Sequence, residues 1–334
     1  MHAVQLREFG PADNLTWVEV PDPAPGVGEI LVSVAAAAVN RADLLFRSGR
    51  YHSGPALPAI PGSEGAGTVV ALGPGVEGFA VGDRVVAWGA IGAPGFYGEL
   101  AVVSADHALP VPAEVDLSTA AVLPVAWLSA WYCLHSLAAM RSGETVLIHA
   151  AASGVGGAAV QIAKDAGASV IAVVGSADKQ AWVRDLGADV ALDRHNADIA
   201  EEVGRITEGR GAEVVLDLVG GDSFSTSLRA VGRTGRVVAM ANVALAPSTI
   251  DTRDFYPKNV TIYGFQITDL MQHGWDPRPD LRDVLAAVAD GRFTVPIDST
   301  FSLEQAASAH RRLESRATRG KIVLTSSTQR GAAS

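Results

Sequence analysis

One stretch, residues 148–176, constrains the fold more than any other part of the chain: IHAAASGVGGAAVQIAKDAGASVIAVVGS. The apolar run TVLIH (145–149) predicts a strand, and the run SVIAVV (169–174) predicts a second one. Between them, Ala159, Ile162, Ala163 and Ala166 follow the spacing of one helix face. A strand, a turn of small residues, a helix and a second strand form a βαβ unit.

More short apolar runs follow this unit, namely EVVLDLV (213–219), RVVAMA (236–241) and VTIYGF (260–265). A helical stripe of Ile199, Val203 and Ile206 precedes them. Strands that are apolar on both faces belong to a parallel sheet with helices on each side. The second half of the chain therefore predicts a doubly wound α/β domain.

The first 110 residues show a different pattern, in which short apolar runs such as EILVSVAAAAV and ELAVV alternate with turn sequences such as PDPAPGVGE. They predict a compact β domain. The last run, KIVLT (321–325), has no other strand close in sequence, so we expect it to join that first domain. The expected domains are 1–123 with 266–334, and 124–265.

The turn AAASGVGG (150–157) carries only small side chains. Free N–H groups at the start of a helix bind phosphate, and larger side chains would keep a diphosphate away from the backbone. The pattern predicts that Ala151, Ser153, Gly154 and Gly156 form this cradle, with Gly156 where helix and strand pack closely. Because Ala151 and Ser153 replace two glycines of the usual G-x-G-x-x-G pattern, a plain tight turn is the alternative.

The end of the second strand discriminates between the two nicotinamide cofactors. NAD sites usually carry an acidic residue there, which binds the ribose 2′-hydroxyl. Here the strand ends with Val174, Gly175 and Ser176, without an acid. Lys179 follows, and Arg194 lies where a third strand is expected to end. Nearby cations favour a 2′-phosphate and therefore NADPH; the alternative is that Lys179 only decorates an exposed helix start.

Charge and cysteine content limit the other classes of function. The net charge is −10 and the 26 basic residues are spread along the chain, which does not favour nucleic acid or anionic lipid. The single cysteine, Cys133, excludes an intramolecular disulfide and a multi-cysteine metal site. No apolar run reaches the roughly 20 residues that span a bilayer, and the first residues do not resemble an export signal. We expect a cytoplasmic protein.

Five segments together resemble the zinc-free quinone oxidoreductases, zeta-crystallin-like members of the medium-chain dehydrogenase/reductase superfamily. The resemblance runs over nearly the whole chain, and the segments that carry it are EFGPADNLTWVEVPDPAPGVGEILVSVAAAAVNRADLLFRSGRY (8–51), PGSEGAGTVVALGPGVEGFAVGDRV (61–85), GFYGELAVV (95–103), LPVAWLSAWYCLHSLAAMRSGETVLIHAAASGVGGAAVQIAKDAGA (123–168) and ESRATRGKIVLT (314–325).

This resemblance implies a GroES-like, mainly β catalytic domain built from both chain ends, a Rossmann domain between them, and bound NADPH. It also implies a homodimer formed by edge pairing of the Rossmann sheets, for which VTIYGF is a plausible edge strand. The cofactor contacts that it implies are Ser129, Ala152, Ser153, Gly154, Val155, Gly156, Gly175, Ser176, Lys179, Arg194, Val219, Gly220, Phe265 and Arg316. Among them, Arg316 would contact the cofactor's phosphates and Ser129 its nicotinamide end. Asp217, beside Gly220, is either part of this crevice or a turn former.

Zinc-dependent relatives place Cys where this chain has Asn40, and Gly-His-Glu where it has Gly62, Ser63 and Glu64. Both soft ligands are missing, so we expect no metal. The resemblance then disfavours alcohol oxidation and favours reduction of a conjugated carbonyl, which is already electrophilic. Glu64 is expected to be a structural hydrogen-bonding acid.

In the relatives, the segment that matches VNRADLLFRSGRY (39–51) lines the substrate pocket. Asn40 could donate a hydrogen bond to the carbonyl oxygen, Asp43 could order the local network, and Tyr51 could supply a proton or a hydrogen bond. The alternatives are that Asn40 satisfies backbone groups, that Asp43 caps a short helix and that Tyr51 only packs. Leu45 stands where relatives often carry an aromatic residue, which indicates a more aliphatic pocket.

The sequence therefore predicts an NADPH-dependent, zinc-independent reductase that transfers hydride to a quinone or to an α,β-unsaturated carbonyl compound. One alternative is an enoyl-thioester or biosynthetic tailoring enoyl reductase of the same family, although no basic patch for a coenzyme A ester is evident in the sequence. The other alternative is a non-catalytic NADPH-binding protein.

Overall fold

The computed structural model describes residues 1–52, 54–89 and 95–326. The chain forms two compact units, Met1–Leu128 with Met271–Ser334 (unit 1) and Ser129–Leu270 (unit 2). Each limit follows the expected one by five residues (128 against 123, and 270 against 265). Both ends of the chain belong to unit 1.

Most of unit 1 is β structure. Its strands are β1 (His2–Leu6), β2 (Leu15–Glu19), β3 (Glu29–Val39), β4 (Glu64–Leu72), β5 (Arg84–Trp88), β6 (Leu100–Ser104), β7 (Ala108–Pro110), β14 (Ile297–Ser302) and β15 (Lys321–Thr325). Its helices are α1 (Arg41–Arg47), α2 (Leu117–Ala120), α9 (Arg278–Ala289) and α10 (Ala306–Glu314), with short 3₁₀ turns at Ala12–Asn14, Ala105–His107 and Leu303–Gln305.

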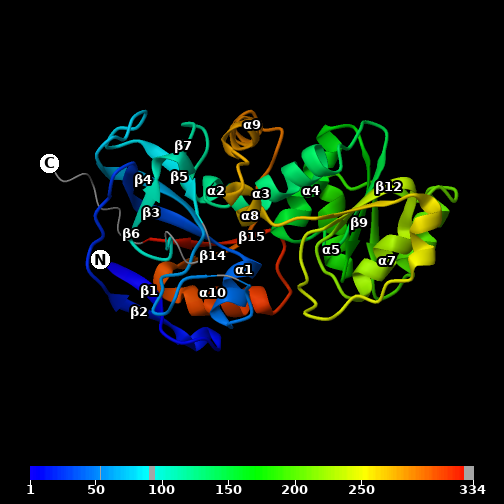
Figure 1. Cartoon of the computed structure of the whole chain (residues 1–334), viewed down its shortest axis with the longest axis horizontal. Coiled ribbons are helices and arrows are strands. Elements are labelled where there is room, and N and C mark those ends of the chain that lie inside the picture. The colour runs from blue at the N-terminus through cyan, green and yellow to red at the C-terminus, as the bar shows by residue number, and fades with distance from the viewer. Residues whose placement is uncertain (53, 90–94, 327–334) are drawn as a thin grey trace. The chain divides into compact units, whose positions relative to one another are not determined.

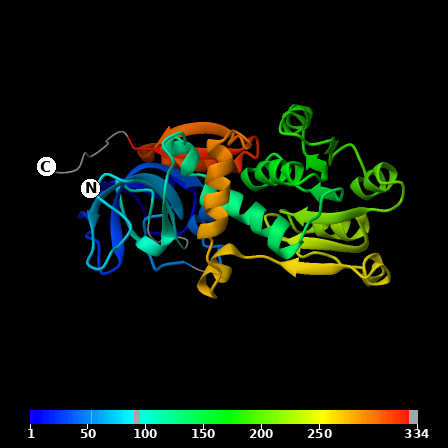
Figure 2. The same ribbon diagram turned by 90° about the horizontal axis from the view of Figure 1, so that it is seen from above.

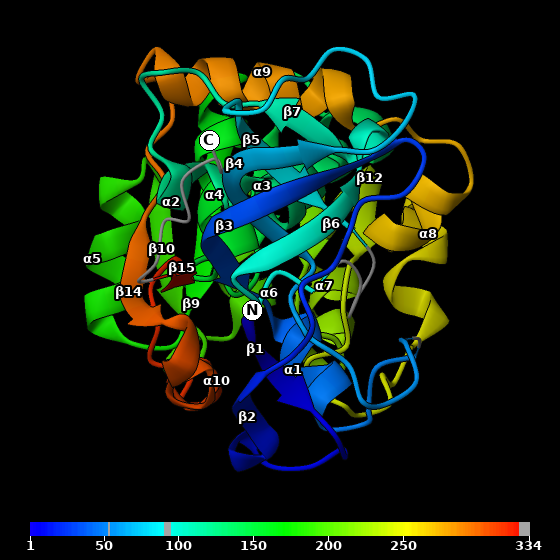
Figure 3. The same ribbon diagram turned by 90° about the vertical axis from the view of Figure 1, so that its left-hand side faces the viewer.

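The main sheet of unit 1 has the strand order β14-β15-β3-β4-β5-β7, and β6 also pairs with β3 (Figure 3). Strand β15 runs antiparallel to β3, so the last strand of the chain completes the sheet that the first residues begin. The hairpin β1–β2 lies beside α10 (Figure 1). This arrangement brings the segment around Asn40, which follows β3, next to β15.

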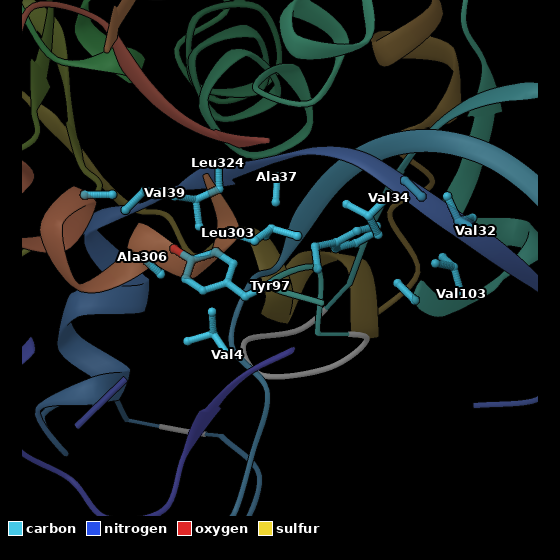
Figure 4. Packing of buried hydrophobic residues seen from close by; sticks show 14 of the residues in the cluster. Val4, Val32, Val34, Ala37, Val39, Tyr97, Val103, Leu303, Ala306 and Leu324 are labelled. Atoms are coloured by element: carbon cyan, nitrogen blue, oxygen red, sulfur yellow. The ribbon is translucent and has the colours of Figure 1, made fainter. Parts of the chain in front are cut away.

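The core of unit 1 lies along β3, whose sequence EILVSVAAAAV is buried at most positions. A Cβ atom at Gly67 of β4 would lie 2.0 Å from the carbonyl oxygen of Ser33, so only glycine fits there. Valine, leucine and tyrosine side chains fill the remaining space, with the Tyr97 ring among them and its hydroxyl toward Ala306 (Figure 4).

Unit 2 alternates strands and helices. Its strands are β8 (Thr145–Ile148), β9 (Ser169–Val174), β10 (Val190–Asp193), β11 (Ala212–Asp217), β12 (Val231–Ala239) and β13 (Thr261–Gly264). Its helices are α4 (Gly154–Asp165), α5 (Ala177–Asp185), α6 (Ile199–Ile206) and α7 (Asp222–Ala230), with a π-helical turn at Tyr132–Leu137 and 3₁₀ turns at Thr252–Asp254 and Tyr256–Lys258. Helices α3 (Leu123–Trp131) and α8 (Ile267–Gln272) contain the limits of the two units.

All strand pairs in unit 2 are parallel, and the order is β10-β9-β8-β11-β12-β13. In chain order this is 3-2-1-4-5-6, the order of the Rossmann fold. Strand β13 forms one edge of the sheet (Figure 2). The predicted fold class, a Rossmann domain with a mainly β domain from both chain ends, is confirmed. Among the described residues, no helix is both long enough and apolar enough to cross a membrane.

Candidate active site

The glycine loop of unit 2 forms the turn between β8 and α4. Ser153 is the N-cap of α4, and its Oγ accepts the N–H of Gly156 at 3.0 Å. A Cβ atom at Gly156 would lie 2.5 Å from the carbonyl oxygen of Ala150, so helix and loop leave no room for a side chain. The N–H groups of Gly154 and Val155 belong to the first helical turn, which has no internal acceptors for them. Backbone donors at a helix start suit a phosphate.

Two predicted cofactor residues meet at the end of β9. The N–H of Arg194 donates to the carbonyl oxygen of Val174 at 3.0 Å, because β10 runs parallel to β9 in this register. The Arg194 guanidinium lies across Gly175, where a Cβ atom would be 3.1 Å from Cζ. Ser176 is the N-cap of α5 and Lys179 lies in its first turn. A cation over a residue without a side chain, at a strand end without an acid, fits the 2′-phosphate of NADPH.

A hollow of about 670 Å³ lies at the carboxyl ends of β11, β12 and β13 in unit 2. It is lined by Asp217, Gly220, Phe224, Ala239, Met240, Ala241, Asn242, Ser248, Ile250, Gly264, Phe265, Gln266 and Asp269. In open α/β sheets this edge is where ligands bind. Two of the predicted cofactor contacts, Gly220 and Phe265, are therefore brought to one hollow.

Asp217 shapes the turn at the rim of this hollow. Its Oδ1 accepts the N–H groups of Val219 (2.8 Å) and Gly220 (2.9 Å), and its Oδ2 accepts the hydroxyl of Ser227 at 3.0 Å. Gly220 has a φ of +75°, which a side chain would strain. Asp217 therefore fits both interpretations, because it lines the hollow and also forms the turn at its rim.

The remaining cofactor candidates are Ala152 in the glycine loop, Ser129 and Arg316. Ala152 is buried within the turn and Ser129 is buried in α3. Arg316 follows α10 in unit 1, with a φ of +56°, whereas the other thirteen candidates belong to unit 2. Its contact with the cofactor stays a prediction.

In unit 1, the predicted catalytic residue Asn40 belongs to a closed group of three side chains. Its Nδ2 donates to Glu64 Oε1 at 2.8 Å, and its Oδ1 accepts from Lys321 Nζ at 2.5 Å. Lys321 Nζ also donates to Glu64 Oε1 at 2.9 Å, and the N–H of Val125 donates to Glu64 Oε2 at 2.7 Å. Glu64 is fully buried and the other two are nearly so. Glu64 thus accepts three hydrogen bonds, as expected of a structural acid.

Asp43 lies next to this group and is also fully buried. Its Oδ2 accepts the backbone N–H of Asn40 at 2.7 Å, so Asp43 is the N3 residue of the capping box of α1, whose N-cap is Asn40. The Tyr97 hydroxyl lies 3.4 Å from the same oxygen and 3.1 Å from Nε2 of His310. Burial raises the pKa of Asp43 to about 7, against the opposing effects of the Asn40 N–H and Lys321. Burial also lowers the pKa of His310 to about 3, so this imidazole is neutral at physiological pH.

Tyr51 lies in the loop after α1 and is half-buried against the core of unit 1. Its backbone N–H donates to Leu45 at 3.2 Å, and its ring centroid lies 4.3 Å from that of His52. These contacts fix the backbone and pack the ring. Whether the hydroxyl acts on a substrate stays a prediction.

Sequence reasoning missed Lys321, Tyr97 and His310. One signal was available in the sequence. Lysine is the first residue of the apolar run KIVLT, and a lysine on a buried strand needs a partner for its ammonium group. Tyr97 and His310 carry no local signal, because each meets its partner across more than 50 residues of chain. At the positions where zinc-dependent relatives carry Cys and His, Asn40 and Ser63 are both buried. The described part of the chain contains no group of three or more residues that could hold a metal ion.

Comparison with known proteins agrees with this architecture. Residues 26–113 match the alcohol dehydrogenase GroES-like domain, and residues 154–290 match the zinc-binding dehydrogenase family. The quinone oxidoreductase of Pseudomonas aeruginosa is 35% identical over 337 residues, which are 96% of this chain and 98% of that protein. The chain belongs to the quinone oxidoreductase family of the medium-chain dehydrogenase/reductase superfamily.

Two other proteins have a similar sequence identity to this chain. The Escherichia coli quinone oxidoreductase in complex with NADPH superposes with a TM-score of 0.90 at 31% identity, covering 97% of this chain and all of that one. The phthioceranic/hydroxyphthioceranic acid synthase of Mycobacterium tuberculosis is 34% identical over 326 residues. These are 96% of this chain, which spans only 15% of the synthase.

Proposed function

We propose that this protein is an NADPH-dependent, zinc-independent reductase that transfers hydride to a quinone or to an α,β-unsaturated carbonyl compound. The observation that carries the proposal is the Arg194 guanidinium over Gly175, beside the phosphate-binding geometry of the glycine loop. The Escherichia coli relative, which is described in complex with NADPH, supports the same cofactor.

In this proposal, bound NADPH supplies the hydride. The N–H groups of Gly154 and Val155 hold its diphosphate, and Lys179 and Arg194 hold its 2′-phosphate. Asn40 donates a hydrogen bond to the carbonyl oxygen of the acceptor, where negative charge develops as hydride arrives. Asp43 holds α1 and the backbone of Asn40 in place.

Tyr51 supplies a proton or a hydrogen bond to the reduced acceptor. Arg316 contacts a phosphate of the cofactor, and the backbone at Val219 and Phe265, with buried Ser129, contacts its nicotinamide end. The protein's work is then orientation and stabilisation of the developing charge.

An enoyl-thioester reductase is the second candidate, because the phthioceranic/hydroxyphthioceranic acid synthase is 34% identical to this chain, against 35% for the Pseudomonas aeruginosa quinone oxidoreductase. A cationic pair in unit 1 favours it. Leu313 accepts a hydrogen bond from the Arg41 guanidinium (3.3 Å) and one from the N–H of Arg316 (3.3 Å). Burial and the Arg316 charge lower the pKa of Arg41, and the Glu314 charge raises it, so the two cations are neighbours with an acid beside them. In this second candidate, Arg41 and Arg316 would bind a phosphate of the thioester carrier, and Arg316 would then not be the contact of the NADPH phosphate.

The decisive experiment is a fluorescence titration with NADPH and NADH, followed by cofactor oxidation with 9,10-phenanthrenequinone, a 2-alkenal and crotonyl-CoA. We expect tighter binding of NADPH, and turnover with at least one acceptor. The preferred acceptor separates the two candidates. Tight binding with no turnover on any acceptor would favour the non-catalytic alternative.

The variants Lys179→Ala and Arg194→Ala test the cofactor assignment. Each removes one cation from the proposed 2′-phosphate site, so we expect the KM for NADPH to rise about tenfold, the equivalent of about 1.5 kcal/mol for a charged hydrogen bond, and the KM for NADH to stay unchanged. Arg205→Ala, on the exposed side of α6 and paired with Glu202, is the matched control. Equal effects on both cofactors would rule out the 2′-phosphate assignment.

We also propose a homodimer that pairs the β13 edges of two Rossmann sheets. Strand β13 is an edge strand, and Ile262 on it is 39% exposed. An exposed, apolar edge strand is a template for pairing with another chain. Light scattering on the wild type and on Ile262→Lys checks this: the variant should be monomeric, and a dimeric variant would place the interface elsewhere.

A further inference from the structure

The ammonium group of Lys321 lies among the buried side chains of unit 1, where the apolar run KIVLT would otherwise carry only hydrophobic residues. Its side chain is 6% exposed and that of Glu64 is not exposed at all. Lys321, Glu64 and Asn40 come from β15, from β4 and from the end of β3, and each contacts the other two. Burying a charge pair is costly, so this group needs a reason beyond stability.

The contacts of this triangle determine how the Asn40 amide is turned. An ammonium group can only donate, so the atom 2.5 Å from Lys321 Nζ must be the amide oxygen. A carboxylate can only accept, so the atom 2.8 Å from Glu64 Oε1 must be the amide nitrogen. The two constraints are independent and agree. Many asparagine amides can turn by 180° at little cost, whereas this one would then meet two repulsive contacts.

This orientation leaves one N–H of the Asn40 amide for a further hydrogen bond. The Asn40 nitrogen carries two hydrogens, and one of them is bound by Glu64. The second has no acceptor among the described residues, and Asn40 keeps 8% of its surface exposed. An N–H donor is what a carbonyl oxygen needs as it gains negative charge. With the amide turned over, the Asn40 oxygen would face that same carbonyl oxygen.

We propose that Lys321 is a positioning residue: its ammonium group holds the Asn40 amide so that only an N–H can reach the carbonyl oxygen of the acceptor. The inference rests on the proposed function, in which Asn40 contacts the acceptor. Lys321 acts through Asn40 and does not itself touch the substrate. The charge on Lys321 also polarises the amide, which strengthens the hydrogen bond that the remaining N–H donates.

The kinetic test uses the double variant Lys321→Met/Glu64→Gln, because Lys321→Met alone leaves a buried unpaired carboxylate. The glutamine introduced at position 64 can accept from Asn40 but, unlike the carboxylate, can also donate to it, so the double variant removes both constraints on the amide. Comparison with Glu64→Gln, which keeps the ammonium group, isolates the part of the effect that belongs to Lys321. We expect kcat to fall at least tenfold, with the KM for NADPH unchanged, and Lys321→Arg to retain more of the activity. Lys164→Met/Asp189→Asn, on the surface of unit 2, is the matched control.

A double-mutant cycle separates positioning from a structural role. Asn40→Ala should lower kcat in the wild type and cause almost no further loss in the Lys321→Met/Glu64→Gln background, because the amide there is already misplaced. Independent effects that multiply would overturn the proposal. An unchanged kcat in the double variant would overturn it as well.

A second readout does not depend on turnover. In ¹⁵N-labelled protein, the side-chain NH₂ signals of Asn40 can be assigned by their loss in Asn40→Asp. We expect one of these protons to exchange slowly with water in the wild type and fast in Lys321→Met/Glu64→Gln. Equal exchange in both would overturn the positioning role. Slow exchange in the wild type alone, with no turnover of any acceptor, would keep the positioning role and reject the proposed reductase.

Discussion

The glycine loop of unit 2 and the Asn40 group of unit 1 are built in opposite ways. The loop uses backbone groups and partners that are near in sequence, such as Ser153 and Gly156, three residues apart. The Asn40 group uses charged side chains whose partners are 257 and 281 residues away along the chain. A phosphate cradle can therefore be a short motif, whereas a buried polar cluster exists only after the whole sheet has formed.

The largest expected effect follows from this difference in burial. Lys321→Met leaves the carboxylate of Glu64 buried without a counter-charge, so we expect a loss of about 3–5 kcal/mol in the free energy of unfolding. Lys164→Met removes an ammonium from an ion pair with Asp189, whose side chains are 34% and 47% exposed, and should cost about 0–1 kcal/mol. Urea denaturation of both variants measures the contrast. Similar losses would mean that burial does not distinguish the two pairs.

A smaller effect tests the glycine loop itself. Gly156→Ala places a methyl group 2.5 Å from a backbone oxygen that cannot rotate away, so we expect a loss of about 1–3 kcal/mol together with weaker NADPH binding. Gly204→Ala is the matched control, since a Cβ atom at this position in α6 meets nothing within 4 Å. It should stabilise the protein by about 0.5–1 kcal/mol through helix propensity. A neutral Gly156→Ala would show that the loop can relax.

The same difference explains how much could be predicted from the sequence. The βαβ pattern around residue 156 predicted the Rossmann domain, because period, turn and strand all lie within 30 residues. That the last strand joins the first domain could be predicted because KIVLT has no other strand nearby in sequence, whereas its pairing with β3 is known only from the structure. The partners of Asp43 could not be predicted, since Tyr97 and His310 lie in segments whose approach depends on tertiary packing. Local patterns carry no record of such contacts.

The pKa of Asp43 gives a test on the unit 1 side with a defined sign. Burial raises this pKa to about 7 from an ordinary value near 3.8, so between those values the folded protein keeps a proton that the unfolded chain releases. Stability is therefore lost as pH rises through this window. Asp43→Asn cannot ionise, so relative to this variant the wild type should lose about 3 kcal/mol between pH 5 and pH 8, because about two pKa units of the window lie there and each corresponds to about 1.4 kcal/mol.

The groups that act on Asp43 are the Asn40 N–H, Lys321, Glu64 and Tyr97, and behind them His310 contacts the Tyr97 hydroxyl; all are present in both proteins. Urea denaturation at pH 5 and pH 8 measures the difference. Asp116→Asn is the control: burial is outweighed by hydrogen bonds from Thr119 that lower the pKa of Asp116, so its contribution does not change between these pH values. If the difference in free energy of unfolding between the wild type and Asp43→Asn is the same at both pH values, Asp43 is ionised throughout.

The smallest expected effect concerns Tyr51. This residue is near Asn40 in sequence, but it is only half-buried, unlike the three side chains of the Asn40 group. Tyr51→Phe keeps the ring packing against His52 and removes one hydroxyl. If that hydroxyl donates a hydrogen bond to the reduced acceptor, kcat should fall about fivefold, the equivalent of about 1 kcal/mol. Tyr256→Phe, at an exposed tyrosine of unit 2, is the control and should leave kcat unchanged. A loss of a hundredfold or more would instead identify Tyr51 as the proton donor. An unchanged kcat would reduce Tyr51 to a packing residue, and the chemistry of unit 1 would then rest on the Asn40 group alone.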